Sequence, residues 1–224
     1  ASESPYRAAI YHARTWASTS KRDLRTPAGH GILAVMLPHG APTTGGLLVA
    51  TPPLEDPNFD RTVVFVHEHH DDGAIGVVIH RPTIEALDEP LDRWIDLQST
   101  PSSIFAGGPV EPNALIALAA THDPLDESDE NLSPITGRIA SADLTADPAL
   151  VAPEVAGVRV FRGYAGWGPG QLEDEIDAGA WLVLESEPDD IFSPEPDELW
   201  RTVLRRQPGR LAWLADAPDD LAAN

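Results

Sequence analysis

Short apolar runs separated by proline, glycine and acidic residues dominate the chain from residue 45 onward. Residues 62–67 and 76–80 are rich in β-branched side chains. Between them, the stretch His69-His70-Asp71-Asp72-Gly73 contains an Asp-Gly pair, a frequent hairpin turn. This pattern predicts an antiparallel hairpin over 62–80. Comparable runs predict further strands at 47–51, 104–106, 114–120, 135–140, 158–161 and 181–185.

Helical spacing is expected in four segments. Pro90 suits the first turn of a helix, and four of the residues after it would fall on one side of a helix over 91–98. The positions with this spacing are Leu91, Trp94, Ile95 and Gln98. Asp147 before Pro148 predicts an N-cap and a short helix over 148–156, and helices are also expected at 170–178 and 196–207. Strands and short helices that interleave irregularly predict an α+β fold.

Residues 1–44 differ in charge from the rest of the chain. They carry five basic and two acidic residues, a charge of +3, whereas residues 45–224 carry ten basic and 34 acidic residues, a charge of −24. Weak periodicity predicts that 1–44 is an N-terminal extension, either flexible or docked through its apolar residues 32–37. Residues 45–224 are expected to form one domain. Met36 is the only methionine, which leaves open that native translation starts there.

The composition restricts the possible functions. A chain without cysteine has no disulfide, thiolate metal site or cysteine nucleophile. A net charge of −21 repels DNA, RNA and anionic membranes, so direct nucleic-acid binding is disfavoured and a protein partner with a basic surface is expected. No apolar run reaches eighteen residues and no secretory signal is recognisable, so we expect a cytoplasmic protein. The oligomeric state stays open.

The densest cluster of special residues is 161–170, with four glycines, one proline and three aromatic residues directly before a predicted helix. One interpretation is a ligand site in which helix N–H groups hold an anion, Tyr164 and Trp167 cover a planar ligand and Gln171 lies nearby. The other is a structural turn with both rings in the core. Acidic residues in the first helical turn, Glu173 among them, favour the structural interpretation because they repel phosphate.

Residues 67–72 (His-Glu-His-His-Asp-Asp) are rich in potential metal ligands. On a strand, His67 and His69 would share one face, as a zinc pair requires, but solvated His and Asp side chains are ordinary at a polar hairpin tip, so no metal is expected. If the hairpin forms, Arg81 is expected beside Glu68 and His69. That cluster is either a structural ion pair or an anion clamp with His69 as acid–base group.

Gly107 and Gly108 complete the candidate ligand- or partner-binding residues. They either let a ligand approach the main chain or simply form a tight turn. The chain has no G-x-S-x-G elbow, no H-E-x-x-H and no recognisable Ser/His/Asp order. We therefore expect no catalytic residues and no cofactor, and an enzyme is disfavoured.

Several segments in order resemble the YqgE/AlgH family (UPF0301) of bacteria. The matching segments are 46–52, 56–59, 68–69, 73–76, 81–82, 107–110, 163–167 and 170–173. The resemblance implies a coiled, bifurcated, mostly antiparallel β-sheet with short peripheral helices. Members are commonly labelled transcriptional regulators. Two departures are His80, where the family usually has asparagine, and the extension 1–44.

The sequence thus predicts a bacterial YqgE/AlgH-like protein that acts as a non-enzymatic regulatory or protein-binding module. The alternative is a small-ligand or anion binder, or an enzyme, that uses Glu68, His69 and Arg81.

Overall fold

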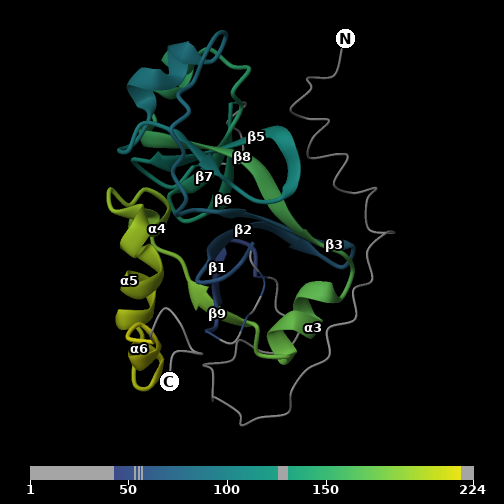
Figure 1. Ribbon diagram of the computed structural model, residues 1–224. Coiled ribbons are helices and arrows are strands. Elements are labelled where there is room, and N and C mark those ends of the chain that lie inside the picture. Colours follow the sequence, from purple (N-terminus) through teal and green to yellow (C-terminus); the bar gives the residue numbers. More distant parts are fainter. Residues whose placement is uncertain (1–42, 53, 55, 57, 126–130, 218–224) are drawn as a thin grey trace.

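The structure is a computed structural model that describes residues 43–217, except 53, 55, 57 and 126–130. Within these residues, nine strands form one sheet and the helices are short (Figure 1). The elements in chain order are β1 (Gly46–Ala50), β2 (Val63–His70), β3 (Gly73–Val78), η1 (Asp92–Leu97), β4 (Ile104–Ala106), β5 (Val110–Thr121), β6 (Leu132–Thr136), β7 (Ile139–Ala142), α2 (Pro148–Val151), β8 (Val155–Trp167), α3 (Gln171–Asp177), β9 (Trp181–Glu185), α4 (Pro188–Ile191), η2 (Pro196–Glu198), α5 (Leu199–Arg205) and α6 (Leu211–Leu214).

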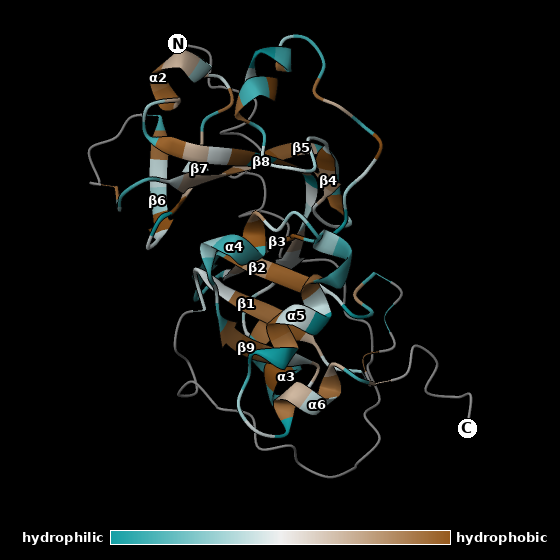
Figure 2. Cartoon of the chain, turned by 90° about the vertical axis from the view of Figure 1, so that its left-hand side faces the viewer, coloured by the Kyte–Doolittle hydropathy of each residue, from teal (hydrophilic) through white to brown (hydrophobic). Residues whose placement is uncertain are grey.

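The long strand β8 holds the two halves of the molecule together. The strand order is β6-β7-β5-β8-β3-β2-β1-β9, and β4 pairs with β8 in parallel. The first part of β8 pairs with β5 and β4 in the upper half, and its last part, 165–167, pairs with β3 in the lower half (Figures 1 and 2). The predicted α+β fold with a bifurcated, mostly antiparallel sheet is therefore confirmed.

Most of the glycine-rich stretch 161–170 lies inside this strand, and the turn before α3 is confined to 168–170, so the prediction that a strand ends at residue 161 is wrong. Gly163 has φ 69°, and a Cβ there would overlap the main-chain oxygen of Gly108. Only glycine allows this angle together with this close approach of two chains. Beyond Gly163, side chains alternate between faces: Tyr164 packs in one core cluster, and Ala165 and Trp167 pack in another.

Three clusters of buried apolar side chains stabilise the fold. One covers the face of the sheet on which α5 and α6 pack, where Trp200 donates its indole N–H to Ala50 O at 2.9 Å, and continues into the upper half at Leu118 and Ile139. The second covers the opposite face of the lower sheet and includes Leu172 of α3. The third lies in the upper half and includes Trp94 of η1 and Val151 of α2. Figure 2 shows the apolar strands β1, β2 and β9 of the lower half.

The hairpin over 62–80 is confirmed, with β2 and β3 paired in antiparallel register and a turn at Asp71 and Asp72. The strand expected at 135–140 is wrong, because Gly137 at φ 52° starts a turn that joins β6 to β7. The helix expected at 148–156 has only the four residues of α2, although Asp147 caps it as predicted by accepting from the Ala149 N–H at 3.0 Å.

The segment expected as an α-helix over 91–98 is the 3₁₀-helix η1. With three residues per turn, Leu91, Trp94 and Leu97 lie on one side, so Trp94 is fully buried while Ile95 is 41% exposed. The helical spacing that placed Ile95 on the same side as Leu91 and Trp94 is therefore wrong.

Within the described residues, no helix is long and apolar enough to cross a membrane. The extension 1–44, apart from Thr43 and Thr44, and most of the acidic segment 123–130 lie outside them. The division into extension and domain stays a prediction.

Candidate functional site

Three of the predicted site residues gather where β2, β8 and α3 meet: His69 near the end of β2, Trp167 at the end of β8 and Gln171 at the start of α3. Glu68, the residue before His69, pairs with Ile75 of β3, so its side chain points to the opposite face of the sheet. His69 and Trp167 both pair with Ala74 of β3, one from each side, so their side chains point to the same face of the sheet. We call this group, together with Glu173, Glu175 and Trp181, the hairpin–α3 site.

A β-bulge decides which side chains of β2 face α3. The register shifts between Val66 and Glu68, so His67 is the extra residue. Before the bulge, the even-numbered Val64 and Val66 point toward the α3 face; after it, His69 does. Without the extra residue, strict alternation would turn His69 to the opposite face.

His69 is held from both sides of its ring. Its Nδ1 accepts the Thr43 main-chain N–H at 3.2 Å and lies 3.1 Å from Thr43 Oγ1, while its Nε2 lies 2.8 Å from Glu173 Oε1. Since Nδ1 accepts a hydrogen bond, Nε2 carries the ring hydrogen and donates it to the Glu173 carboxylate. The imidazole is only 8% exposed. His69 therefore links the residues before β1 to α3.

The two histidines of the predicted metal pair, His67 and His69, lie in different surroundings. The His67 Nδ1 lies 3.7 Å from Glu68 Oε1, and its buried Nε2 has no hydrogen-bond partner among the described residues. Burial lowers the pKa of His67, although the Glu68 carboxylate opposes this. The Nδ1 lone pair of His69 is already used by Thr43. Among the described residues, no three His, Cys, Asp or Glu side chains are grouped as a metal ion would require.

Glu175 and Trp181, which the sequence did not single out, complete the site. Glu175 Oε2 accepts the indole N–H groups of Trp167 at 2.9 Å and Trp181 at 2.8 Å, and its Oε1 accepts the Gln171 amide at 2.9 Å. Phe59 packs against both indoles, with ring centroids 6.4 and 5.5 Å away. The spacing of Gln171 and Glu175, four apart on a helix, was the available signal.

The helix start does not offer an open anion site. Gln171 Oε1 accepts the N–H of Gly168 at 3.1 Å, and Glu173 and Asp174 occupy the first turn of α3. Trp167 is 7% and Tyr164 3% exposed, so neither ring presents a face to a planar ligand. These contacts match the structural interpretation of the glycine-rich stretch.

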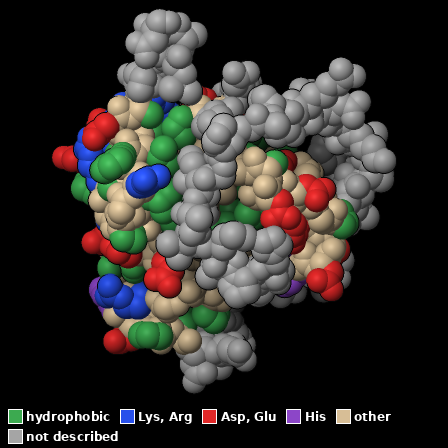
Figure 3. Space-filling view, turned by 90° about the horizontal axis from the view of Figure 1, so that it is seen from below, with side chains coloured by type: hydrophobic (Ala, Val, Ile, Leu, Met, Phe, Trp, Pro, Cys, Tyr) green, Lys and Arg blue, Asp and Glu red, His purple; other side chains and the backbone are tan. Residues whose placement is uncertain are grey.

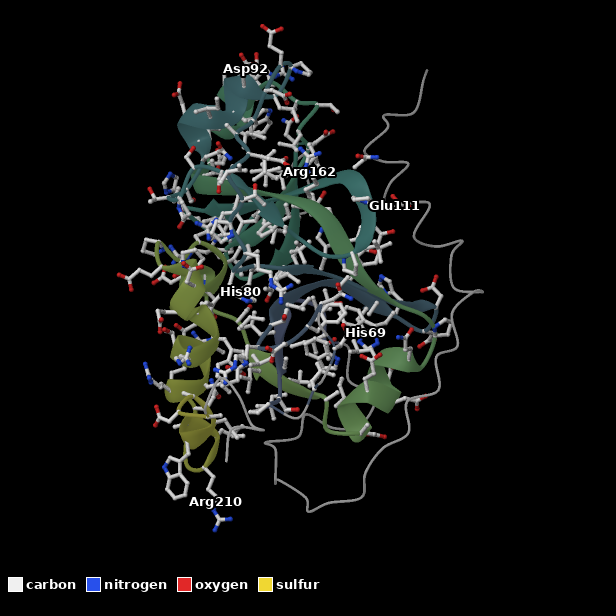
Figure 4. All side chains as sticks on the ribbon, in the orientation of Figure 1. His69, His80, Asp92, Glu111, Arg162 and Arg210 are labelled. Carbon is white, nitrogen blue, oxygen red and sulfur yellow. The ribbon has the colours of Figure 1, made fainter. Side chains whose placement is uncertain are left out.

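Arg81 lies away from Glu68 and His69, so the expected three-residue cluster is wrong. It follows β3 and donates to Asn58 O at 2.7 Å and Thr62 Oγ1 at 2.6 Å, beside the start of β2. Thr62 and Glu68 are six residues apart in extended chain, which corresponds to roughly 20 Å. Burial lowers the pKa of Arg81, opposed by Asp60. Figure 4 shows the separation between His80, which precedes Arg81, and His69.

Gly107 and Gly108 face the main chain of β8 rather than an open space. A Cβ on Gly107 would overlap Gly163 O, and one on Gly108 would overlap the main chain of Tyr164. Burial raises the pKa of Tyr164 to about 12, and the charge of Glu111 and a hydrogen bond to it add to the effect. The two glycines thus permit close packing of two chain segments.

Arg159 is a buried cation that sequence reasoning missed. It is 1% exposed, and its guanidinium donates to Thr100 O at 2.6 Å, Ile191 O at 2.8 Å and Ser193 O at 3.2 Å. Its Cζ lies 4.2 Å from the Phe105 ring centroid. Burial lowers the pKa of Arg159 to about 10. It joins the 188–193 segment to β8, which is a structural role.

Proteins with similar sequences include UPF0301 proteins of several bacteria. A UPF0301 protein of Streptomyces coelicolor is 49% identical over 185 residues, which cover 81% of this chain and 95% of the relative. One of Thermobifida fusca is 46% identical over 190 residues, 81% of this chain and 95% of the relative. None of these names states an activity.

Two solved structures share the fold. A crystal structure from Corynebacterium diphtheriae matches with a TM-score of 0.75 and 31% identity, covering 80% of this chain and 94% of that one. The solution structure of AlgH from Pseudomonas aeruginosa matches with a TM-score of 0.57 and 28% identity, covering 83% and 100%. The sequence profile described as AlgH-like matches residues 47–212. This chain therefore belongs to the AlgH-like family, UPF0301.

Proposed function

We propose that this AlgH-like protein is a non-enzymatic regulatory or protein-binding module of the bacterial cytosol. The observation that carries the proposal is the closed hydrogen-bond network of the hairpin–α3 site. His69 is engaged by Thr43 and Glu173, and Glu175 by two indoles and an amide. A catalytic acid or base needs a proton or lone pair directed at a substrate. Here these groups hold β2, β8, β9 and α3 together instead.

The charge of the molecule supports a basic protein as partner. The described residues contain ten arginines and 27 carboxylates, a formal charge of −17. Seen from below, acidic side chains lie across the face, whereas the basic ones lie toward its left side (Figure 3). The negative electrostatic field of this charge accelerates association with basic proteins and opposes association with nucleic acid.

The test uses the full-length protein as bait at physiological salt, beside a Glu173→Gln variant. The side-chain amide of the variant still accepts from His69, but the negative charge of the Glu173 carboxylate beside that ring is removed. We expect both proteins to retain the same partner in quantitative mass spectrometry. A substrate screen that finds turnover in the wild type and none in Glu173→Gln would replace the binding module with an enzyme.

A hydrolytic enzyme is the second candidate, because Thr43 Oγ1, His69 and Glu173 stand in the hydroxyl–imidazole–carboxylate order of nucleophilic triads. Two features oppose it: Thr43 is 6% exposed, and its main-chain N–H donates to the same Nδ1. Ester hydrolysis that is lost in Thr43→Val but kept in Thr43→Ser would support this candidate.

A further inference from the structure

The upper end of the molecule carries aliphatic side chains in contact with water. Because η1 is wound as a 3₁₀-helix, Ile95 is 41% exposed between Asp92 and Asp96 instead of packing beside Leu91. In α2, Pro148 and Val151 are buried, while Leu150 is 64% exposed. Both exposed side chains therefore belong to elements whose other side is fixed in the core.

These two elements adjoin. Trp94 donates its indole N–H to Leu144 O at 3.2 Å, and Arg93 donates to Thr145 O at 3.3 Å, so the segment leading into α2 lies along η1. The two helices also contact one another. Asp92 stands at this end of the molecule, opposite Arg210 (Figure 4). Ile95 and Leu150, with Asp92, Asp96, Asp143 and Asp147, form what we call the η1–α2 surface.

The negative charge of this surface is not neutralised from within the described chain. All four aspartates are exposed, and none forms an ion pair with another described residue. Asp143 and Asp147 accept hydrogen bonds from Thr145 and Ala149 only, which leaves their charge in place. The neighbouring arginine, Arg93, donates its guanidinium to a main-chain oxygen rather than to a carboxylate.

We propose that the η1–α2 surface binds a basic amphipathic segment of a partner protein. Aliphatic side chains of the segment pack on Ile95 and Leu150, and its lysines or arginines lie against the surrounding aspartates. Apolar contacts surrounded by charge are the usual arrangement of a protein interface. The local charge agrees in sign with the −17 of the described residues, so long-range attraction and close contact select the same partner. This inference rests on the proposed function, since it names a surface and a partner chemistry for it.

The experiment measures fluorescence anisotropy of a labelled 14-residue peptide of leucine and lysine, with leucine at helical spacing, against the full-length protein at physiological salt. We expect saturable binding that weakens at least fivefold in Ile95→Ser/Leu150→Ser and at least tenfold in Asp92→Lys/Asp96→Lys. A peptide with serine in place of leucine is expected to bind the wild type and the serine variant equally weakly. The four positions are exposed, so the variants are expected to unfold at the wild-type temperature.

Two matched controls separate this surface from general attraction. Trp213→Ser removes an apolar side chain, 72% exposed, from the opposite end of the molecule, and Asp174→Lys reverses a charge on the exposed side of α3. Neither is expected to change binding more than twofold. Absence of saturable binding to the wild type, or equal weakening by the control variants, would overturn the inference.

If the partner captured from lysate stays bound to Ile95→Ser/Leu150→Ser, this inference fails while the proposed function stands. If the wild type captures none, the proposed function fails.

Discussion

His80 makes the stability of the protein depend on pH in a way that one substitution removes. Burial, and next the charge of Arg81, lower the pKa of His80 from 6.5 to about 4. Its Nδ1 accepts the Val63 N–H at 3.4 Å, which keeps that nitrogen unprotonated in the folded state. Above pH 6.5 the ring is neutral in both the folded and the unfolded chain. Below pH 6.5 the unfolded chain binds a proton at His80 and the folded chain does not, so the free energy of unfolding decreases as the pH falls toward 4.

The shift sets the size of the effect. At about 1.4 kcal/mol for each pH unit, the interval from 6.5 to about 4 corresponds to a loss of about 3 kcal/mol, of which about 2 kcal/mol has occurred at pH 5. The matched variant is His80→Asn. Asparagine is neutral at every pH, and its side-chain oxygen can accept the same N–H.

The assay is urea unfolding followed by tryptophan fluorescence from pH 8 to pH 4 for both proteins. The free energy of unfolding of the wild type relative to His80→Asn is expected to fall by about 3 kcal/mol across this range. His67, whose pKa is also lowered, is common to both proteins and cancels in the difference. Parallel curves for the two proteins would refute the reasoning, because they would mean that His80 takes up its proton equally in both states.

Three further predictions use the same unfolding assay. Glu175→Gln removes a carboxylate oxygen shared by two indoles and is expected to lower the free energy of unfolding by about 1–3 kcal/mol. Its control, Asp174→Asn on the exposed side of α3, is expected to lower it by less than about 0.5 kcal/mol. Equal losses in the two variants would contradict a stabilising role of the hydrogen-bond network in the hairpin–α3 site. Gly108→Ala places a Cβ against the main chain of Tyr164 and is expected to cost more than about 2 kcal/mol. Gly170→Ala, at φ 73° but with open space around it, serves as its control at about 1 kcal/mol. Arg159→Met leaves three carbonyl oxygens without their donor and is expected to cost about 3 kcal/mol; an unchanged midpoint would show that these carbonyls find other donors.

The sequence predicted the elements whose signal is local. The β-branched run of β2 and the Asp-Gly turn gave the hairpin, and the ordered motifs gave the family. It did not predict that β8 continues through Gly163, because the need for glycine there comes from Gly108, 55 positions earlier in the chain. Arg159 was missed for the same reason: its partners are main-chain oxygens of distant segments, and these have no sequence signature.

The errors at the hairpin–α3 site and at the η1–α2 surface have one kind of physical cause, a change in the repeat of the chain. A strand pattern assumes period two, and an extra residue at His67 reverses the faces beyond it, which brings His69 to Glu173. A helix pattern assumes 3.6 residues per turn, and winding at three residues per turn moves Ile95 from the core to the surface. In both cases the change of period is fixed by contacts with distant residues: Thr44 Oγ1, which accepts the His69 N–H at 2.9 Å, and Leu144 O, which accepts from Trp94. The sequence pattern therefore cannot predict the exposure of side chains next to such a change, and only the folded structure shows it. Here they include the histidine that closes the hairpin–α3 site and the isoleucine that makes the η1–α2 surface apolar.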